Sequence, residues 1–120
     1  MVPVFKNTSK NFFSLPNELF FLNIGHGVIT VYAYLLYCED RRTHQCHPSY
    51  RTISDVVHLT VSTVMKHITK LADRQFITVE STSYIDKRGM KWNGNNLYTI
   101  LPIQMAMDYC YQQQLLRLEA

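Results

Sequence analysis

The chain has few cysteines, no long apolar run and no signal peptide, and each absence excludes a class of protein. The chain has three cysteines, Cys38, Cys46 and Cys110, and this small, odd number does not suit a disulfide framework. Reduced thiols in a cytosol are the simplest interpretation. The longest clean apolar run, Val31 to Cys38, is too short to span a bilayer, and the N-terminus lacks the apolar stretch of a signal peptide. We therefore expect a cytoplasmic protein without a membrane partner.

The sequence also lacks the common catalytic motifs. It has no glycine-rich phosphate loop, no Gly-x-Ser-x-Gly elbow and no His-Glu-x-x-His pair. His44, Cys46 and His47 are metal-ligand types, but they lie closer together than the usual paired spacing and have no clear fourth ligand. We expect no enzyme activity, no cofactor and no metal.

Length and charge narrow the remaining classes. A chain of 120 residues is one domain by length, and it can bury roughly two thirds of the surface that its unfolded form exposes. Its net charge of +3 is modest. Residues 41–91, however, hold nine of the twelve lysines and arginines and only four of the nine acids. This concentration of positive charge favours a nucleic-acid partner for that segment.

Residues 48–74 have the pattern of two short helices joined by a tight turn. Ser49 follows a proline and is a good N-cap for the first helix. Its predicted apolar face is Ile53, Val56 and Val57. Leu59 is expected to fill the turn as an apolar plug.

Thr60 is the expected N-cap of the second helix, which is amphipathic. Val61, Val64, Ile68 and Leu71 recur at helical spacing and predict a buried stripe. The opposite face is polar and contains Ser62, Thr63, Lys66, His67, Thr69 and Lys70. Hydroxyls near the helix N-terminus and cations further along are typical of a helix that lies in the major groove of DNA. The segment therefore predicts a helix-turn-helix.

The flanking segments complete the predicted fold. Before the helix-turn-helix we expect, in order, a loose arm at 1–11, an extended segment at 12–15 and a short helix after Pro16. A helix at 28–41, with Arg41 and Arg42 at its negative C-terminal end, and a loop at 43–47 follow. After it we expect strands at 76–82 and 97–101 around a loop at 86–96, and a final helix from Pro102 to about residue 118. The fold class is thus mainly α with a small β-hairpin wing, a winged helix-turn-helix. We expect a single domain at 1–120, with a core at 12–101 and a C-terminal helix at 102–118.

Five segments carry a family resemblance, in family order. They are Leu15–Phe20, Val31–Leu36, Cys46–Ile53, Ser62-Thr63-Val64 with Ile68 and Leu71, and Asn96–Ile100. Through them the chain resembles the winged helix-turn-helix domains of Gram-positive bacterial plasmids, phages and integrative elements, which are grouped with plasmid replication initiators. The resemblance implies a winged helix that binds duplex DNA. One position departs from the family, since Gln75 stands where relatives usually have glycine.

Twelve residues are the predicted DNA contacts. Ser62, Thr63, Lys66 and His67 are expected at base edges, and Ser49, Tyr50, Arg51 and Lys70 at phosphates. Thr60 joins them at the helix N-terminus, and the wing adds Lys87, Arg88 and Lys91. Trp92, the single tryptophan, is expected to pack under the wing.

Two questions stay open at this stage. The C-terminal helix has more apolar surface than one packed stripe needs, so it either packs across the chain's own N-terminal helices or forms a two-fold homodimer contact. The favoured function is a transcriptional regulator on a mobile element that binds duplex DNA. The alternatives are the origin-binding module of a plasmid or phage replication initiator, and a winged helix used only for protein–protein contact.

Overall fold

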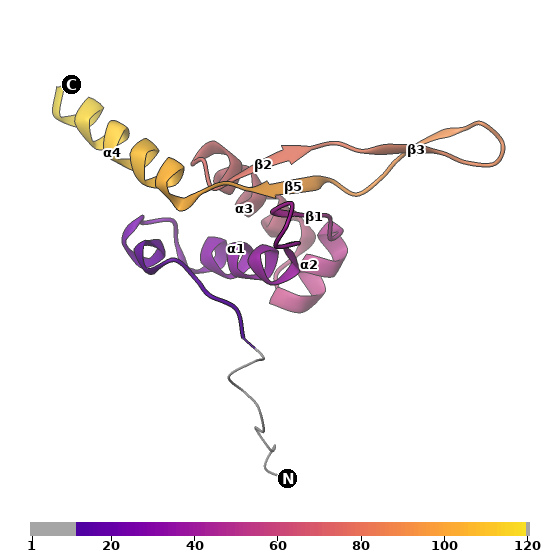
Figure 1. The fold of residues 1–120 in the computed structure, drawn as a ribbon, viewed down its shortest axis with the longest axis horizontal. Helices are drawn as coiled ribbons and strands as arrows, with labels where there is room; N and C mark the ends of the chain where they lie inside the picture. The colour runs from indigo at the N-terminus through magenta and orange to yellow at the C-terminus, as the bar shows by residue number, and fades with distance from the viewer. Residues whose placement is uncertain (1–11, 120) are drawn as a thin grey trace, which may run out of the picture.

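The computed structural model describes residues 12–119, which form four α-helices, a short 3-10 helix and five short strands (Figure 1). In chain order these elements are η2 (Asn17–Phe21), α1 (His26–Cys38), β1 (Gln45–Cys46), α2 (Tyr50–Val57), α3 (Val61–Asp73), β2 (Ile77–Glu80), β3 (Ser83–Ile85), β4 (Lys91–Asn93), β5 (Leu97–Ile100) and α4 (Ile103–Glu119).

The N-terminal segment follows the prediction only in part. η2 begins directly after Pro16, as expected, and it is a single short 3-10 helix. The segment at 12–15 forms no strand, although Phe13 and Leu15 pack against the core. The predicted arm at 1–11 lies outside the described residues.

α1 is shifted toward the N-terminus relative to the predicted helix at 28–41. It begins after Gly25, whose φ of 92° suits glycine, and it stops at Glu39, which has extended backbone angles. Arg41 and Arg42 therefore lie in the turn between α1 and β1, not in the last helical turn. Arg41 Nε is 3.9 Å from Glu39 Oε1, but this exposed arginine adds little to stability.

The core lies where α1, α2, α3 and the sheet meet. α1 contributes Val31, Tyr32 and Leu35, and the Tyr32 ring meets the Phe76 ring edge to face at 5.2 Å. α2 contributes Ile53, which is fully buried. Each such side chain stabilises the fold by about 1.5–3 kcal/mol through burial. The remaining core residues include Val64, Ile68 and Leu71 of α3 and Ile77, Tyr98 and Ile100 of the sheet.

Both predicted caps of the helix-turn-helix are confirmed. Ser49 Oγ accepts a hydrogen bond from the Thr52 backbone N–H at 3.0 Å, and Thr60 Oγ1 accepts one from the Thr63 N–H at 3.3 Å. Between them α2 ends at His58, which adopts the left-handed conformation with φ 58°. Leu59 then packs against the core, as expected of an apolar plug. These local interactions set where α2 ends and α3 begins.

Two residues predicted to be buried are exposed. Val56 on α2 is 49 % exposed and Val61 on α3 is 41 % exposed. At about 100° per residue, Val61 lies roughly 50° around the helix from the centre of the stripe formed by Val64, Ile68 and Leu71. It therefore falls at the edge of the stripe, where the core does not cover it.

A small antiparallel sheet, in the order β1-β5-β2, covers the helices (Figure 1). Ile77 pairs with Ile100 and Glu80 with Leu97, and the hairpin continues outward through β3 and β4. The predicted loops at 43–47 and 86–96 are thus wrong in part, because they contain β1 and β4. β1 is a strand because Gln45 and Cys46 pair with Thr99 and Tyr98 across the sheet, which no local pattern signals.

α4 leaves the body at the end of the sheet opposite the hairpin tip (Figure 1). Its first half packs through Ala106, which is buried, and through Ile103, Met107 and Cys110, which are half-buried. Its residues 111–119 are all exposed. Within residues 12–119, no helix combines the length and the apolar character needed to cross a membrane.

Candidate nucleic-acid interface

α3 has an outer face that the rest of the described chain leaves uncovered. The exposed face of α3 consists of Val61, Ser62, Met65, Lys66, Thr69 and, at its C-terminal end, Asp73. It lies beside the buried stripe that anchors α3 to α1 and the sheet. Because the helix is capped and packed on one side only, this face is held rigidly toward solvent.

Ser62 and Lys66 are predicted contacts that the structure places on this face. Lys66 is exposed, and none of the acids in residues 12–119 lies within salt-bridge distance of it. Thr60 and Thr63 lie at the start of the helix, where the Thr60 hydroxyl donates to Thr63 Oγ1 at 2.8 Å. Their hydroxyls are therefore occupied in the cap, and Ser62 Oγ lies 3.3 Å from Thr60 Oγ1 at the same end of the face.

His67 and Lys70, also predicted contacts, lie on another side of α3 and meet the start of α1. Lys70 Nζ donates a hydrogen bond to the Ile24 carbonyl oxygen at 3.0 Å. The His67 ring lies so close to Gly27 that a Cβ there would come within 2.6 Å of His67 Nε2. Burial, followed by the positive charge of Lys70 and by His26, lowers the pKa of His67 below its ordinary value. The structure does not bring these two side chains together with Ser62 and Lys66.

Val61 and Met65 belong to the exposed face but were missed by sequence reasoning. Val61 was assigned to the buried stripe, and Met65 is 45 % exposed without any polar atom to draw attention to it. Their angular positions around the helix could have shown this, because both residues lie at the edge of the buried stripe, on the same side as Ser62. Apolar side chains on a DNA-facing helix suit the methyl group of thymine.

The predicted phosphate contacts lie at the start of α2, beside the base of the hairpin. Ser49, Tyr50 and Arg51 line a hollow of about 440 Å³ together with Val61 of α3 and residues 94–96. The Tyr50 hydroxyl accepts a hydrogen bond from Asn96 Nδ2 at 2.8 Å. Arg51 is exposed, whereas Ser49 uses its hydroxyl in the helix cap. The hollow brings residues from α2, α3 and the hairpin to one place, although they are far apart in sequence.

The base of the hairpin is tied to the helix-turn-helix by a second contact. Asn95 Nδ2 donates to the His47 carbonyl oxygen at 3.1 Å, just before α2. Together with the Tyr50–Asn96 hydrogen bond, this contact sets the direction in which the hairpin leaves the body. The tip then lies well away from the helices (Figure 1).

The hairpin tip carries the third group of predicted contacts. Lys87, Arg88 and Lys91 are exposed, and none of them forms an ion pair with an acid of the described chain. The turn between β3 and β4 is built around Asp86, whose Oδ1 accepts from the backbone N–H groups of Arg88 and Met90, each at 2.9 Å. Like charges held this close favour a polyanionic partner.

Trp92 does not pack under the hairpin, so that expectation is wrong. Its side chain is 52 % exposed, and its Nε1–H donates to Asp86 Oδ2 at 2.8 Å. This hydrogen bond is the largest cause of a lowered pKa at Asp86. The reason for the exposure is that β3 and β4 extend past the three-stranded sheet, where none of the helices in residues 12–119 covers either face (Figure 1).

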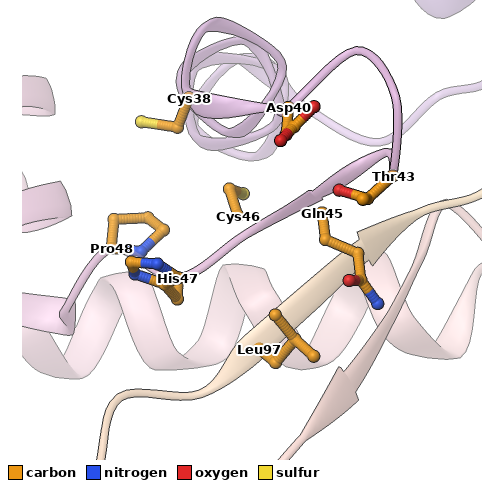
Figure 2. A pocket seen from close by; sticks show the side chains of 8 residues that line it. All are labelled: Cys38, Asp40, Thr43, Gln45, Cys46, His47, Pro48 and Leu97. Atoms are coloured by element: carbon orange, nitrogen blue, oxygen red, sulfur yellow. The ribbon is translucent and has the colours of Figure 1, made fainter.

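A second hollow lies at the end of α1. It is lined by two of the three cysteines and by two of the three candidate metal ligands, Cys46 and His47. Figure 2 shows Cys38, Cys46 and His47 among its lining residues, in a cavity of about 440 Å³. Burial raises the pKa of Cys46 to about 12, so its thiol stays protonated at neutral pH, and only the thiolate is a good metal ligand. His44, the third candidate ligand, is not among the residues that line this hollow, and its Nδ1 lies 3.3 Å from Glu39 Oε2. Residues 12–119 contain no group of three or more histidine, cysteine or acidic side chains placed to hold a metal.

Comparisons with known proteins agree with this architecture. Residues 22–77 match the model of a helix-turn-helix domain family. Within these residues the chain is similar to a helix-turn-helix domain. The match runs from the end of η2 through α3 to the first residue of β2, so it stops before the hairpin.

One solved structure extends the likeness to the wider fold. It is that of a possible transcriptional regulator from Methanosarcina mazei Go1, with 21% sequence identity and a TM-score of 0.52. The likeness covers 82% of this chain and 76% of that one. A comparison with curated protein sequences gives no match. Four helices with small antiparallel sheets are consistent with a helix-turn-helix domain that carries a β wing.

Proposed function

We propose that this protein is a winged helix-turn-helix that binds duplex DNA, with the exposed face of α3 in the major groove and the hairpin as its wing. One observation carries the proposal. The capped helix α3 leaves its outer face free, and this face, the start of α2 and the hairpin tip together expose five cations that have no acidic partner in residues 12–119. These cations are Arg51, Lys66, Lys87, Arg88 and Lys91.

The contacts divide by chemistry. Lys66 reaches guanine O6 or N7, Ser62 contacts either a base edge or a phosphate, and Val61 and Met65 contact thymine methyl groups. Arg51 binds phosphate at the start of α2. Lys87, Arg88 and Lys91 bind the backbone through the wing. Ser49, Tyr50, Thr60 and Thr63 shape the α2 and α3 ends of this surface, and His67 and Lys70 flank it.

The favoured role is regulation of transcription on a mobile element. Two observations support it: the likeness to a possible transcriptional regulator, and the resemblance to domains of plasmids, phages and integrative elements. The family that the chain resembles also includes replication initiators, so the origin-binding module of an initiator is the second candidate. The third candidate is a winged helix used only for protein–protein contact.

Fluorescence anisotropy across a salt series tests these roles. The labelled duplexes are a random sequence, the region upstream of the protein's own gene, and the replication origin of the replicon that carries it. With about four to six phosphate contacts per protomer, the log–log salt slope is expected to be about −4 to −5. Preference for the upstream DNA supports a regulator, and preference for the origin supports an initiator. If no duplex binds even at low salt, DNA binding is excluded and the protein-contact role remains.

Two charge deletions give the assay a matched control. Lys66→Ala is expected to weaken binding about tenfold at the preferred site, since it removes a base contact. Arg117→Ala removes an exposed cation from α4, at the other end of the molecule from the hairpin, and is expected to leave the affinity within about twofold. Equal effects of the two substitutions would contradict the placement of α3 on DNA.

We also propose that α4 pairs two copies of the chain. Met107, Tyr111, Leu115 and Leu118 follow helical spacing on one side of α4. Met107 packs against the core, but Tyr111, Leu115 and Leu118 are 61, 40 and 82 % exposed. The apolar stripe thus continues from the body into solvent, where a second α4 would cover it.

Light scattering tests the pairing directly. The protein is expected to be a dimer, and Leu115→Glu is expected to make it monomeric. Gln112→Glu, an exposed polar position on the same helix, is the control and should leave the dimer intact. A wild-type monomer at high concentration would exclude the pairing. A dimer would present two copies of α3 to neighbouring half-sites about 34 Å apart.

A further inference from the structure

The tip of the hairpin combines an aromatic face with unpaired cations, which duplex backbone contact alone does not require. Tyr84 on β3 lies directly opposite Trp92 on β4, so the two rings project from the same face of the hairpin. They are 56 and 52 % exposed, and Met90 beside them is 56 % exposed. An ordinary soluble hairpin tip exposes few large apolar side chains together.

The orientation of Trp92 is set by the turn that joins the two strands. Asp86 Oδ2 accepts the Trp92 Nε1–H at 2.8 Å, while Asp86 Oδ1 accepts two backbone N–H groups of the turn. The backbone of the turn is itself closed, since Asp86 N donates to Met90 O at 2.9 Å and Gly89 N to Asp86 O at 3.0 Å. The indole ring is therefore held by its edge, and about half of the side chain is left to solvent.

The two rings do not cover one another. The ring pairs in contact among the described residues are Phe13–Tyr37, Tyr32–Phe76 and Tyr34–Tyr37, so Tyr84 and Trp92 are not packed as a pair. Held aromatic faces on adjacent strands, with lysine and arginine beside them, are the arrangement on which proteins stack unpaired bases. The cations at the tip are Lys87, Arg88 and Lys91.

We propose that the hairpin tip binds unpaired nucleotides next to the duplex site, by stacking a base on Trp92, with Tyr84 as the neighbouring platform. The backbone of that strand is held by the cations of the tip. The inference rests on the proposed DNA binding of α3, which holds the adjoining duplex. Its occupant is single-stranded DNA, and not the minor groove of a closed duplex, because an indole face stacks only on a base that is free of its own neighbour in the helix.

The single tryptophan makes the proposal directly measurable, since the intrinsic tryptophan fluorescence of this protein reports on the hairpin tip alone. The full chain is titrated with a blunt duplex, with the same duplex carrying an oligothymidine overhang, and with oligothymidine. Anisotropy of labelled DNA measures binding in parallel. The expected result is quenching of Trp92 by the overhang duplex and not by the blunt duplex, and about tenfold tighter binding of the overhang duplex.

Variants separate stacking from charge and from folding. Trp92→Ala is expected to remove the preference for the overhang while keeping the affinity for blunt duplex within about twofold. Trp92→Phe retains an aromatic face and is expected to keep part of the preference. Phe20→Ala, which removes an exposed aromatic side chain of η2, is the matched control and should leave the preference unchanged. Circular dichroism checks that each variant is folded.

Three results would overturn the proposal. If blunt and overhang duplexes bind equally and Trp92 fluorescence does not change, the tip takes no base, while duplex binding by α3 stands. If both duplexes quench Trp92 equally, the ring enters the groove of closed DNA instead. If neither DNA changes the anisotropy at low salt, this inference fails together with the proposed function.

Discussion

Gln75 carries backbone strain that a single substitution should relieve. It follows α3 and has a φ of 68°, in the left-handed region. Its N–H donates to the Ala72 carbonyl at 3.2 Å, and the N–H of Phe76 donates to the Leu71 carbonyl at 3.0 Å. These two bonds form a Schellman motif, which requires the left-handed conformation at residue 75 and for which glycine is the usual residue.

The magnitude follows from two opposing terms. A residue with a Cβ loses about 1–2 kcal/mol in the left-handed conformation, and glycine avoids that loss. Glycine in turn gives up about 0.5–1 kcal/mol more conformational entropy on folding. Gln75→Gly is therefore expected to raise the free energy of unfolding by about 1 kcal/mol. For a domain of this size, the gain corresponds to an increase of about 4 °C in Tm.

Thermal and urea denaturation followed by circular dichroism measure the effect. Two controls accompany it. Gln75→Ala keeps the Cβ and should change stability by less than about 0.5 kcal/mol. Lys66→Gly, at an exposed position in the middle of α3, should destabilise by about 1 kcal/mol, because glycine weakens a helix interior. If Gln75→Gly stabilises no more than Gln75→Ala, the strain assigned to residue 75 is refuted.

Four further predictions concern the α2 cap, His67, Lys70 and the exposed face of α3. Ser49→Ala removes the α2 cap and should lower the free energy of unfolding by about 1 kcal/mol, whereas Ser81→Ala, at an exposed site outside the strands, should leave it nearly unchanged in the same urea titration. The pKa of His67 is lower in the folded protein than in the unfolded chain, so as the pH falls the imidazole becomes protonated first in the unfolded chain. The free energy of unfolding should therefore decline below about pH 6.5. Urea unfolding measured between about pH 5 and 7 should show a smaller decline for His67→Gln than for the wild type. If the two proteins show the same decline, His67 is not its cause. Lys70→Met should lower the free energy of unfolding by about 1 kcal/mol, because it leaves the Ile24 carbonyl oxygen without its hydrogen-bond donor. The same substitution should weaken DNA binding less than Lys66→Ala does. If Lys70→Met weakens binding more, Lys70 contacts DNA. Replacing thymine by uracil in the bound site removes the methyl groups, and should weaken the wild-type protein but not the Val61→Ala, Met65→Ala double variant, if those side chains meet thymine.

Much of the helix-turn-helix could be predicted from the sequence because its signals are local. Ser49 and Thr60 cap helices through hydrogen bonds that span three residues, and both caps are present. Val64, Ile68 and Leu71 repeat at the period of a helix, and all three are buried. The strands before and after the hairpin turn were predicted from their β-branched and apolar residues, and β2 and β5 lie within the predicted ranges. These features depend on a few neighbouring residues, so the sequence alone determines them.

The direction in which α3 faces was decided only by tertiary packing. Lys70 bonds to Ile24, a residue 46 positions earlier, and His67 lies against Gly27 of α1. Val61 is exposed because the core ends at the edge of the stripe. A hydrophobic pattern shows that one side of a helix is buried, but the neighbouring helices decide how wide that side is and which polar residues adjoin it.

The hairpin shows the same division. Sequence determined β2, β5 and the basic turn, but not the outer strands β3 and β4. Nor did it show that Trp92 would be exposed, or that Gln45 and Cys46 would add a strand to the sheet. Both outcomes depend on segments that are distant in the chain. β1 forms because β5 offers free backbone groups, and Trp92 stays exposed because the hairpin extends past every helix that could cover it. Local sequence sets the helices, β2 and β5 of this protein, and packing between distant segments sets which of their faces are exposed.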